Sequence, residues 1–134
     1  MNPEDFIKTI YLGDRGCKSI HIKGWDKQVA IEVNEISRIR DASGLWNYYN
    51  EENIVDGLIV FTGVKEITFS PPGLIPNDFI NNLEVTETKE GFYTFMLSID
   101  SVDETPYQHE VFIEIKATGI HLEDPTKPGE KITD

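Results

Sequence analysis

Hydrophobic and polar residues alternate along most of this chain, which is the pattern of β-strands with one buried and one exposed face. The clearest run is residues 93–99, and residues 111–115 repeat it. Similar segments cover residues 20–22, 29–39, 58–69, 83–85, 93–99, 111–115 and 120–122. We therefore expect a mainly β protein, an antiparallel sandwich or open barrel of about seven strands.

Turn signals separate these segments. Residues 24–26, with sequence Gly-Trp-Asp, lie between the first two segments and predict a hairpin. The alternation slips at Gly63 inside the third segment, and we expect a β-bulge there. Two prolines and a glycine at residues 71–73 end that segment.

The two ends of the chain differ in their signals. Asn2 is a suitable helix cap and Pro3 suits the first helical position, so a short N-terminal helix is expected within residues 3–10. Residues 124–134 contain two prolines and a single aliphatic residue, which is typical of a flexible polar tail. We expect a single β-rich domain over residues 1–123, followed by that tail.

Composition narrows the class of protein. A chain of 134 residues is most simply one domain that buries a sizeable core. Its single cysteine, Cys17, excludes an internal disulfide. The longest apolar run, residues 58–61, is far too short to cross a bilayer, and the N-terminus lacks the apolar run of a signal peptide. We expect a cytoplasmic protein.

Charge is distributed unevenly along the chain. Residues 1–40 carry seven Lys or Arg against six Asp or Glu, whereas residues 41–134 carry five against eighteen. An acidic field of this size repels nucleic acid and anionic membranes and attracts basic proteins. The expected partner is therefore a basic protein, with no nucleic acid and no membrane.

Motifs for catalysis and metal binding are scarce. The chain has no glycine-rich phosphate loop, no nucleophile elbow and no paired cysteines. Its three histidines, His21, His109 and His121, lie on different predicted strands, which does not favour a zinc site. Cys17 is separated from His21 by four residues, roughly 12 Å or more along a strand, so we interpret it as a buried thiol. We expect no enzyme activity, no metal and no cofactor.

Two groups of residues are candidates for a partner-binding surface. Trp46 and Tyr48 lie in an irregular polar stretch, where aromatic side chains often anchor interfaces; alternatively, they fill core on a short strand. The other candidates are carboxylates clustered in two predicted turns: Glu51, Glu52, Asp56, Asp100, Asp103 and Glu104. The alternative for these acids is a solvated turn, and none of them matches a calcium-binding loop.

Four stretches of the chain resemble an uncharacterised family of small bacterial domains: residues 11–18, 36–40, 46–49 and 73–78. This resemblance covers most of residues 3–123 and implies no particular activity. More loosely, the size, acidity and β-rich pattern are similar to immunity proteins of polymorphic toxin and contact-dependent growth-inhibition systems. That second resemblance implies a protein that binds and blocks a cognate toxin domain, often a cationic nuclease.

These observations lead to one functional hypothesis and three alternatives. The hypothesis is a non-catalytic acidic binding protein, an immunity protein that neutralises a cognate toxin domain such as a nuclease. The first alternative is a small-ligand carrier, with an apolar cavity lined by residues such as Phe95 and Phe112. The others are an enzyme that uses carboxylates and an accessory subunit of a bacterial complex, which predicts an exposed apolar patch. The oligomeric state is left open.

Overall fold

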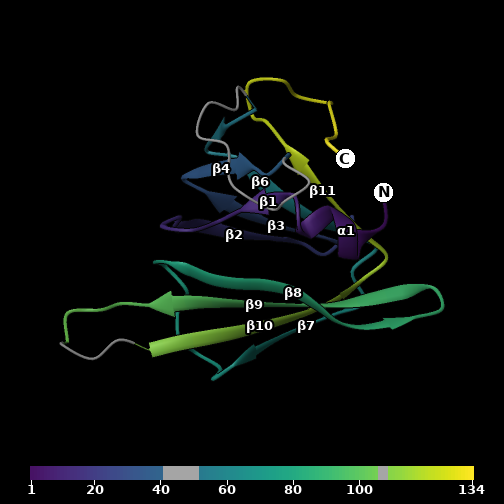
Figure 1. Ribbon diagram of the computed structural model, residues 1–134. Coiled ribbons are helices and arrows are strands. Elements are labelled where there is room, and N and C mark those ends of the chain that lie inside the picture. Colours follow the sequence, from purple (N-terminus) through teal and green to yellow (C-terminus); the bar gives the residue numbers. More distant parts are fainter. Residues whose placement is uncertain (41–51, 106–108) are drawn as a thin grey trace.

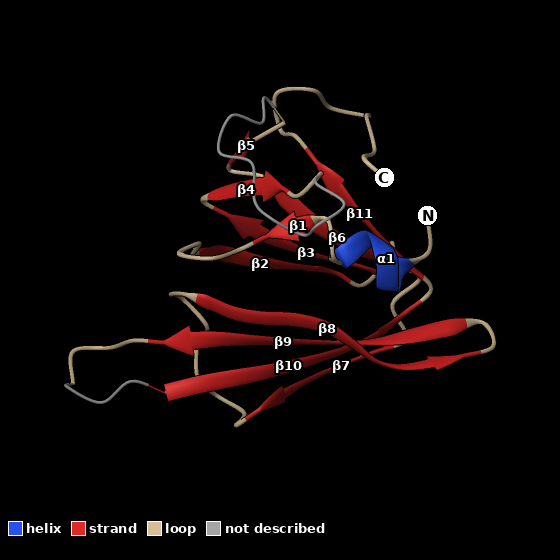
Figure 2. Ribbon diagram, viewed as in Figure 1, coloured by secondary structure: helices blue, strands red, loops and turns tan. Residues whose placement is uncertain are grey.

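The computed structural model describes residues 1–40, 52–105 and 109–134 (Figure 1). Within these ranges the chain forms one short helix and eleven strands, and every strand pair is antiparallel. Two four-stranded sheets lie face to face, with a three-stranded sheet beside one of them (Figure 2). The expected mainly β class with a short N-terminal helix is confirmed, and the sheets form a sandwich rather than a closed barrel.

The first sheet has the strand order β11-β6-β3-β2. Its strands are β2 (Cys17–Lys23), β3 (Gln28–Val33), β6 (Leu58–Thr62) and β11 (Gly119–Glu123). The predicted hairpin at residues 24–26 joins β2 to β3, and Lys27 N donates to Gly24 O at 3.2 Å. This prediction is confirmed.

A small sheet, β1-β4-β5, continues from the first one. It contains β1 (Ile10–Tyr11), β4 (Glu35–Arg38) and β5 (Ile54–Val55). Asn34 alone separates β3 from β4, and Asp56, with a φ of 54°, precedes Gly57 between β5 and β6. The break at Asn34 divides a segment that the alternation pattern shows as continuous, whereas β1 and β5 are two-residue strands outside the predicted segments. Both differences raise the number of strands above the predicted one.

The second sheet has the strand order β7-β10-β9-β8. Its strands are β7 (Glu66–Ser70), β8 (Ile80–Lys89), β9 (Phe92–Ser101) and β10 (His109–Ala117). Three of these strands are nine or ten residues long, so this sheet extends past the first one in Figure 1. Its two faces consequently differ in how much of them is covered.

The chain passes between the two sheets at Gly63 and again at Thr118. β6 ends at Thr62 in the first sheet and β7 begins at Glu66 in the second; β10 and β11 make the reverse passage. Thr118 N donates to Thr62 O at 2.9 Å and links the two crossings. The predicted bulge at Gly63 is therefore wrong: the slip in alternation marks a strand that changes sheets, a known way to make a corner. Gly63 has a φ of 59°, and a Cβ there would overlap Thr118 Oγ1.

Alternate residues of both sheets meet in one apolar core. Phe61 of β6 and Phe95 of β9 contact each other edge to face, with their ring centroids 5.0 Å apart. Burying these rings supplies much of the force that holds the two sheets together. Phe112, in contrast, lies on the other face of the second sheet and is 44% exposed. Phe95 and Phe112 therefore do not line one internal cavity.

The helix α1 (Pro3–Ile7) forms as its capping residues predict. Asn2 Oδ1 accepts a hydrogen bond from Asp5 N at 2.8 Å, which satisfies one of the free N–H groups at the helix start. Phe6 is fully buried and anchors the helix to the core. No helix among the described residues has the length and apolar character to cross a membrane.

The C-terminal segment differs from the expected flexible tail. Ile132 N donates to Leu122 O and Leu122 N donates to Ile132 O, both at 2.9 Å, so the chain folds back onto the edge of β11. Ile132 also packs against the core as the one aliphatic residue of the segment. The composition of this segment is typical of a flexible tail, but one aliphatic contact and one β-bridge attach it to the domain.

Candidate functional site

The structure separates the residues that the sequence placed in one partner-binding surface. Trp46, Tyr48 and Glu51 lie outside the described residues. Glu52 accepts two hydrogen bonds from Arg40, at 2.6 and 3.1 Å, in a bidentate ion pair. Asp56 pairs with Lys18 Nζ at 2.7 Å, and this contact raises the pKa of Lys18. Both acids flank β5, where their charges are matched by these cations.

The second predicted acid cluster begins at the end of β9 and continues into the turn after it, in the other layer of the molecule. Asp100 is only 6% exposed, and its carboxylate accepts a hydrogen bond from Asn81 Nδ2 at 2.7 Å. It therefore offers little charged surface to a partner. Asp103 and Glu104 are exposed. The hydroxyl and N–H of Thr105 both donate to Asp103 Oδ1 and hold the pKa of that carboxyl below its usual range.

A larger group of carboxylates gathers on the outward face of the second sheet, which we call the acidic face. Cross-strand register places these side chains opposite the core-facing residues of the same strands. The acidic face contains Glu66 of β7, Glu84 and Glu87 of β8, and Glu110 and Glu114 of β10. Four of them are exposed and Glu114 is half-buried. The sheet thus brings together carboxylates from positions up to 48 residues apart.

Apolar side chains lie between these carboxylates. Met96 of β9 is half-buried, and its cross-strand neighbours are Glu114 on one side and Glu84 on the other. Phe112 is next to Glu114 along the same face of β10. An aromatic residue and a methionine surrounded by charged residues match the composition of many protein interfaces, with an apolar centre and a polar rim.

Lys116 is a cation within the acidic face. Its Nζ lies 3.2 Å from Glu66 Oε2, and this hydrogen bond is the largest of the influences that raise the pKa of Lys116. The charges of Glu114 and Glu87 raise it further. A lysine whose protonated form is favoured by three glutamates shows that the local field is negative. A cation from another protein would experience the same field.

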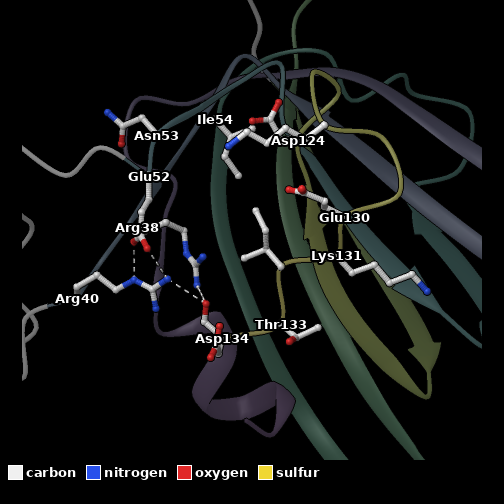
Figure 3. Close-up of a pocket in the computed structure, with 12 residues that line it drawn as sticks. Arg38, Arg40, Glu52, Asn53, Ile54, Asp124, Glu130, Lys131, Thr133 and Asp134 are labelled. Carbon is white, nitrogen blue, oxygen red and sulfur yellow. Dashed lines mark hydrogen bonds and ion pairs between the residues drawn. The ribbon is translucent and has the colours of Figure 1, made fainter.

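A polar pocket lies elsewhere, between the small sheet and the C-terminal segment (Figure 3). Its volume is about 420 Å³. Arg38 Nη2 and Arg40 Nη2 both donate to the main-chain oxygen of Asp134, at 2.9 and 3.0 Å. The two arginines thereby fasten the C-terminal segment, and Glu52 matches the charge of Arg40 (Figure 3).

Arg38 is the most deeply placed of these charged residues, with 1% of its surface exposed. Its guanidinium donates to Thr9 Oγ1 at 2.7 Å and lies over the Phe6 ring, 5.4 Å from the ring centroid. Burial is the main cause that lowers the pKa of Arg38. Because its contacts join α1, β4 and the C-terminal segment, we interpret Arg38 and its pocket as a structural anchor. No signal in the sequence distinguishes this arginine from a surface one.

The remaining candidates for chemistry do not converge. His21 and His121 lie on the two edge strands of the first sheet, whereas His109 begins β10 in the second. The described residues contain no group of three His, Cys, Asp or Glu side chains arranged to hold a metal ion. Cys17 is buried, and burial raises the pKa of its thiol to about 11, which suppresses the thiolate that a nucleophile requires.

Comparison with known proteins identifies a family. A model of a protein family described as a family of unknown function, DUF6258, matches residues 1–134. The chain belongs to this family. This confirms the expected membership of an uncharacterised family. No curated protein and no solved structure matches the chain.

The acidic face was missed because its carboxylates are not neighbours in the sequence. Local clustering drew attention to Asp103 and Glu104 in a turn, whereas the acidic face is built from single glutamates on separate strands. A usable signal was present in residues 110–114, where Glu110, Phe112 and Glu114 alternate with buried residues. An exposed aromatic between two glutamates has the composition of a protein interface, in which aromatic residues are enriched and a polar rim surrounds them.

Proposed function

We propose that this protein is a non-catalytic binding protein that docks a basic protein onto its acidic face. The observation that carries the proposal is the pattern on the second sheet, with five carboxylates around exposed Phe112 and half-buried Met96. Carboxylates accelerate and orient the approach of a cationic surface, and burial of the apolar centre then slows dissociation.

The partner class that we propose is a toxin domain, which the protein neutralises by one-to-one docking in the cytoplasm as an immunity protein. Support comes from the resemblance in size, acidity and β-rich pattern and from the net charge of −12. Blocking a cationic active site requires a complementary surface and no reactive residues on the inhibitor. The acidic face meets this requirement with side chains held on a sheet, which keeps them in place before binding.

The test uses the protein encoded by the neighbouring gene as the probe, because toxin and immunity genes are normally adjacent. Binding is measured by surface plasmon resonance for the full chain and for a variant that combines Glu84→Lys with Glu114→Lys. We expect the variant to bind at least about tenfold more weakly, mainly through a slower association rate. The matched control combines Asp26→Lys with Glu130→Lys, which changes net charge equally at exposed positions outside the acidic face. It is expected to bind within about threefold of the wild type.

Two further measurements separate electrostatic docking from other modes of binding. The association rate should fall about tenfold or more as salt is raised from low to physiological concentration. Phe112→Ala should increase the dissociation rate, since it removes the aromatic side chain from the centre of the interface. Absence of binding, or binding that neither salt nor the Glu84 and Glu114 charge reversals affect, would contradict the proposal.

A further inference from the structure

The edge strand β2 is not used by the proposed function, and within the described residues most of its outer edge is unpaired. β2 is last in the order of the first sheet and pairs with β3 on one side only. On its other side, Cys17 N donates to Asp78 O at 2.9 Å, where the chain makes a short bridge next to Gly16. From Ser19 to Lys23, no strand among the described residues pairs with this side of β2. An unpaired strand edge presents free N–H and C=O groups to another strand.

An apolar groove runs beside this open edge. Ile20 and Ile22 project from the core-facing side of β2, because their partners in β3 are the buried Ile31 and Val29. Ile22 is nevertheless 56% exposed. The groove has a volume of about 310 Å³, and its other apolar walls are Phe69, Leu74, Ile75 and Pro76. Ile75 is 73% exposed.

We propose that β2 pairs in antiparallel orientation with β2 of a second copy of this chain, so that the two first sheets join into one. The twofold axis passes beside His21, which faces His21 of the other copy. Ile20 then lies opposite Ile22 of the other copy, and both isoleucines enter the joined apolar grooves. The contact uses the same patch on each copy, as a closed dimer requires.

The position of the twofold axis follows from the residues at the two ends of the free edge. A register centred on Ile20 would bring Lys23 against Cys17, whose outer edge Asp78 already occupies. A register centred on Ile22 would place Ile20 opposite Gly24 of the other copy, which leaves Ile20 without an apolar partner across the joined strands. The register centred on His21 avoids both, because Lys23 faces the hydroxyl of Ser19 and the two isoleucines face each other. Lys18 is engaged by Asp56 within its own copy.

Charge favours a second copy at this edge of the first sheet over the second sheet. Each copy carries a net charge of −12, so copies repel one another over most of their surface. The strands of the first sheet carry two lysines and two glutamates, whereas those of the second carry six carboxylates and two lysines. The open edge thus lies in the sheet where two copies approach with the least repulsion. Raising the salt concentration should therefore strengthen the dimer.

The first test is sedimentation equilibrium of the full chain across the micromolar concentration range. We expect a reversible dimer, and we expect Ile22→Lys to raise its dissociation constant at least about tenfold, because the variant places two unpaired charges in the joined groove. Phe112→Lys, on the acidic face, is the control and should leave the dimer unchanged. Circular dichroism verifies that both exposed substitutions preserve the fold.

The second test reports the register directly. Directly opposite residues of antiparallel strands have Cα atoms about 4.5–5.5 Å apart, which is within reach of a disulfide. His21→Cys should therefore form a covalent dimer with diamide as the oxidant, whereas Glu104→Cys, exposed in the turn after β9, should not. A wild-type protein that stays monomeric, or a dimer that Ile22→Lys leaves intact, would overturn the proposal whatever the outcome of the toxin-binding experiment. Equal cross-linking of both cysteine variants would refute the register.

Discussion

The two four-stranded sheets share one core but expose different chemistry on their outward faces. On the inside, both contribute aliphatic and aromatic residues that meet at Phe61 and Phe95. On the outside, the second sheet displays glutamates around Phe112, whereas the strands of the first sheet carry equal numbers of lysines and glutamates. The net acidity of a chain therefore does not locate a binding surface, because the fold decides on which face the carboxylates lie.

Substitutions on the inner and outer faces of the second sheet should differ most in their effect on the free energy of unfolding. Phe95→Ala removes a fully buried ring between the sheets and should lower the free energy of unfolding by about 4 kcal/mol. Phe112→Ala makes the same change on the outward face of the same sheet and should alter it by about 0.5 kcal/mol or less. Urea denaturation measures both. Similar losses in the two variants would show that the outward face is part of the packed structure.

The corner that joins the sheets should give the next largest effect. Gly63→Ala places a Cβ against Thr118 at a residue with a φ of 59°, so steric overlap adds to backbone strain. We expect a loss of about 3 kcal/mol in the free energy of unfolding. Gly73→Ala is the matched control, since its φ is 91° but no atom lies within 4 Å of the new Cβ. Strain alone should cost about 1–2 kcal/mol there. Equal losses would show that the close approach at Thr118 relaxes freely.

The smallest effect should come from charge on the outward faces. Glu84→Gln relieves repulsion among the carboxylates of the acidic face and should raise the free energy of unfolding by about 0.3 kcal/mol at low salt. The gain should disappear at high salt, where these charges are screened. Glu32→Gln on the first sheet should give no such gain, because the charge of Glu32 favours protonated Lys18. An equal gain in the free energy of unfolding in both variants would show that the two sheets do not differ in the repulsion among their charges.

Local chemistry explains which parts of the fold were predictable from the sequence. The helix cap at Asn2 and the hairpin at residues 24–26 depend on neighbours in the chain, and both formed as expected. The alternation pattern predicts one bulged strand around Gly63, where the chain crosses between the sheets, because alternation indicates burial and not which sheet supplies the neighbouring strands. The C-terminal segment was not predictable in this way. It is anchored by Arg38, which is far from it in the sequence, and by Leu122, which lies on β11.

The candidate site shows the same division. Clustering along the chain suggested that Asp100, Asp103 and Glu104 share one surface, but Asp100 is buried beside Asn81. The glutamates of the acidic face come from three strands, and only the pairing of those strands makes them neighbours. The predicted anchors Trp46 and Tyr48 lie outside the described residues and stay predictions.

By itself, the sequence determined the all-β class, the family, the net charge and the shortage of catalytic motifs, because each of these depends on composition or on short-range pattern. The tertiary structure alone decided which carboxylates share a face, which strand edge remains open and which arginine is buried. Those outcomes depend on strand order and register, which are set by contacts between residues distant in the chain. Alternation predicts that a strand has two faces, but only its neighbours decide what each face contacts.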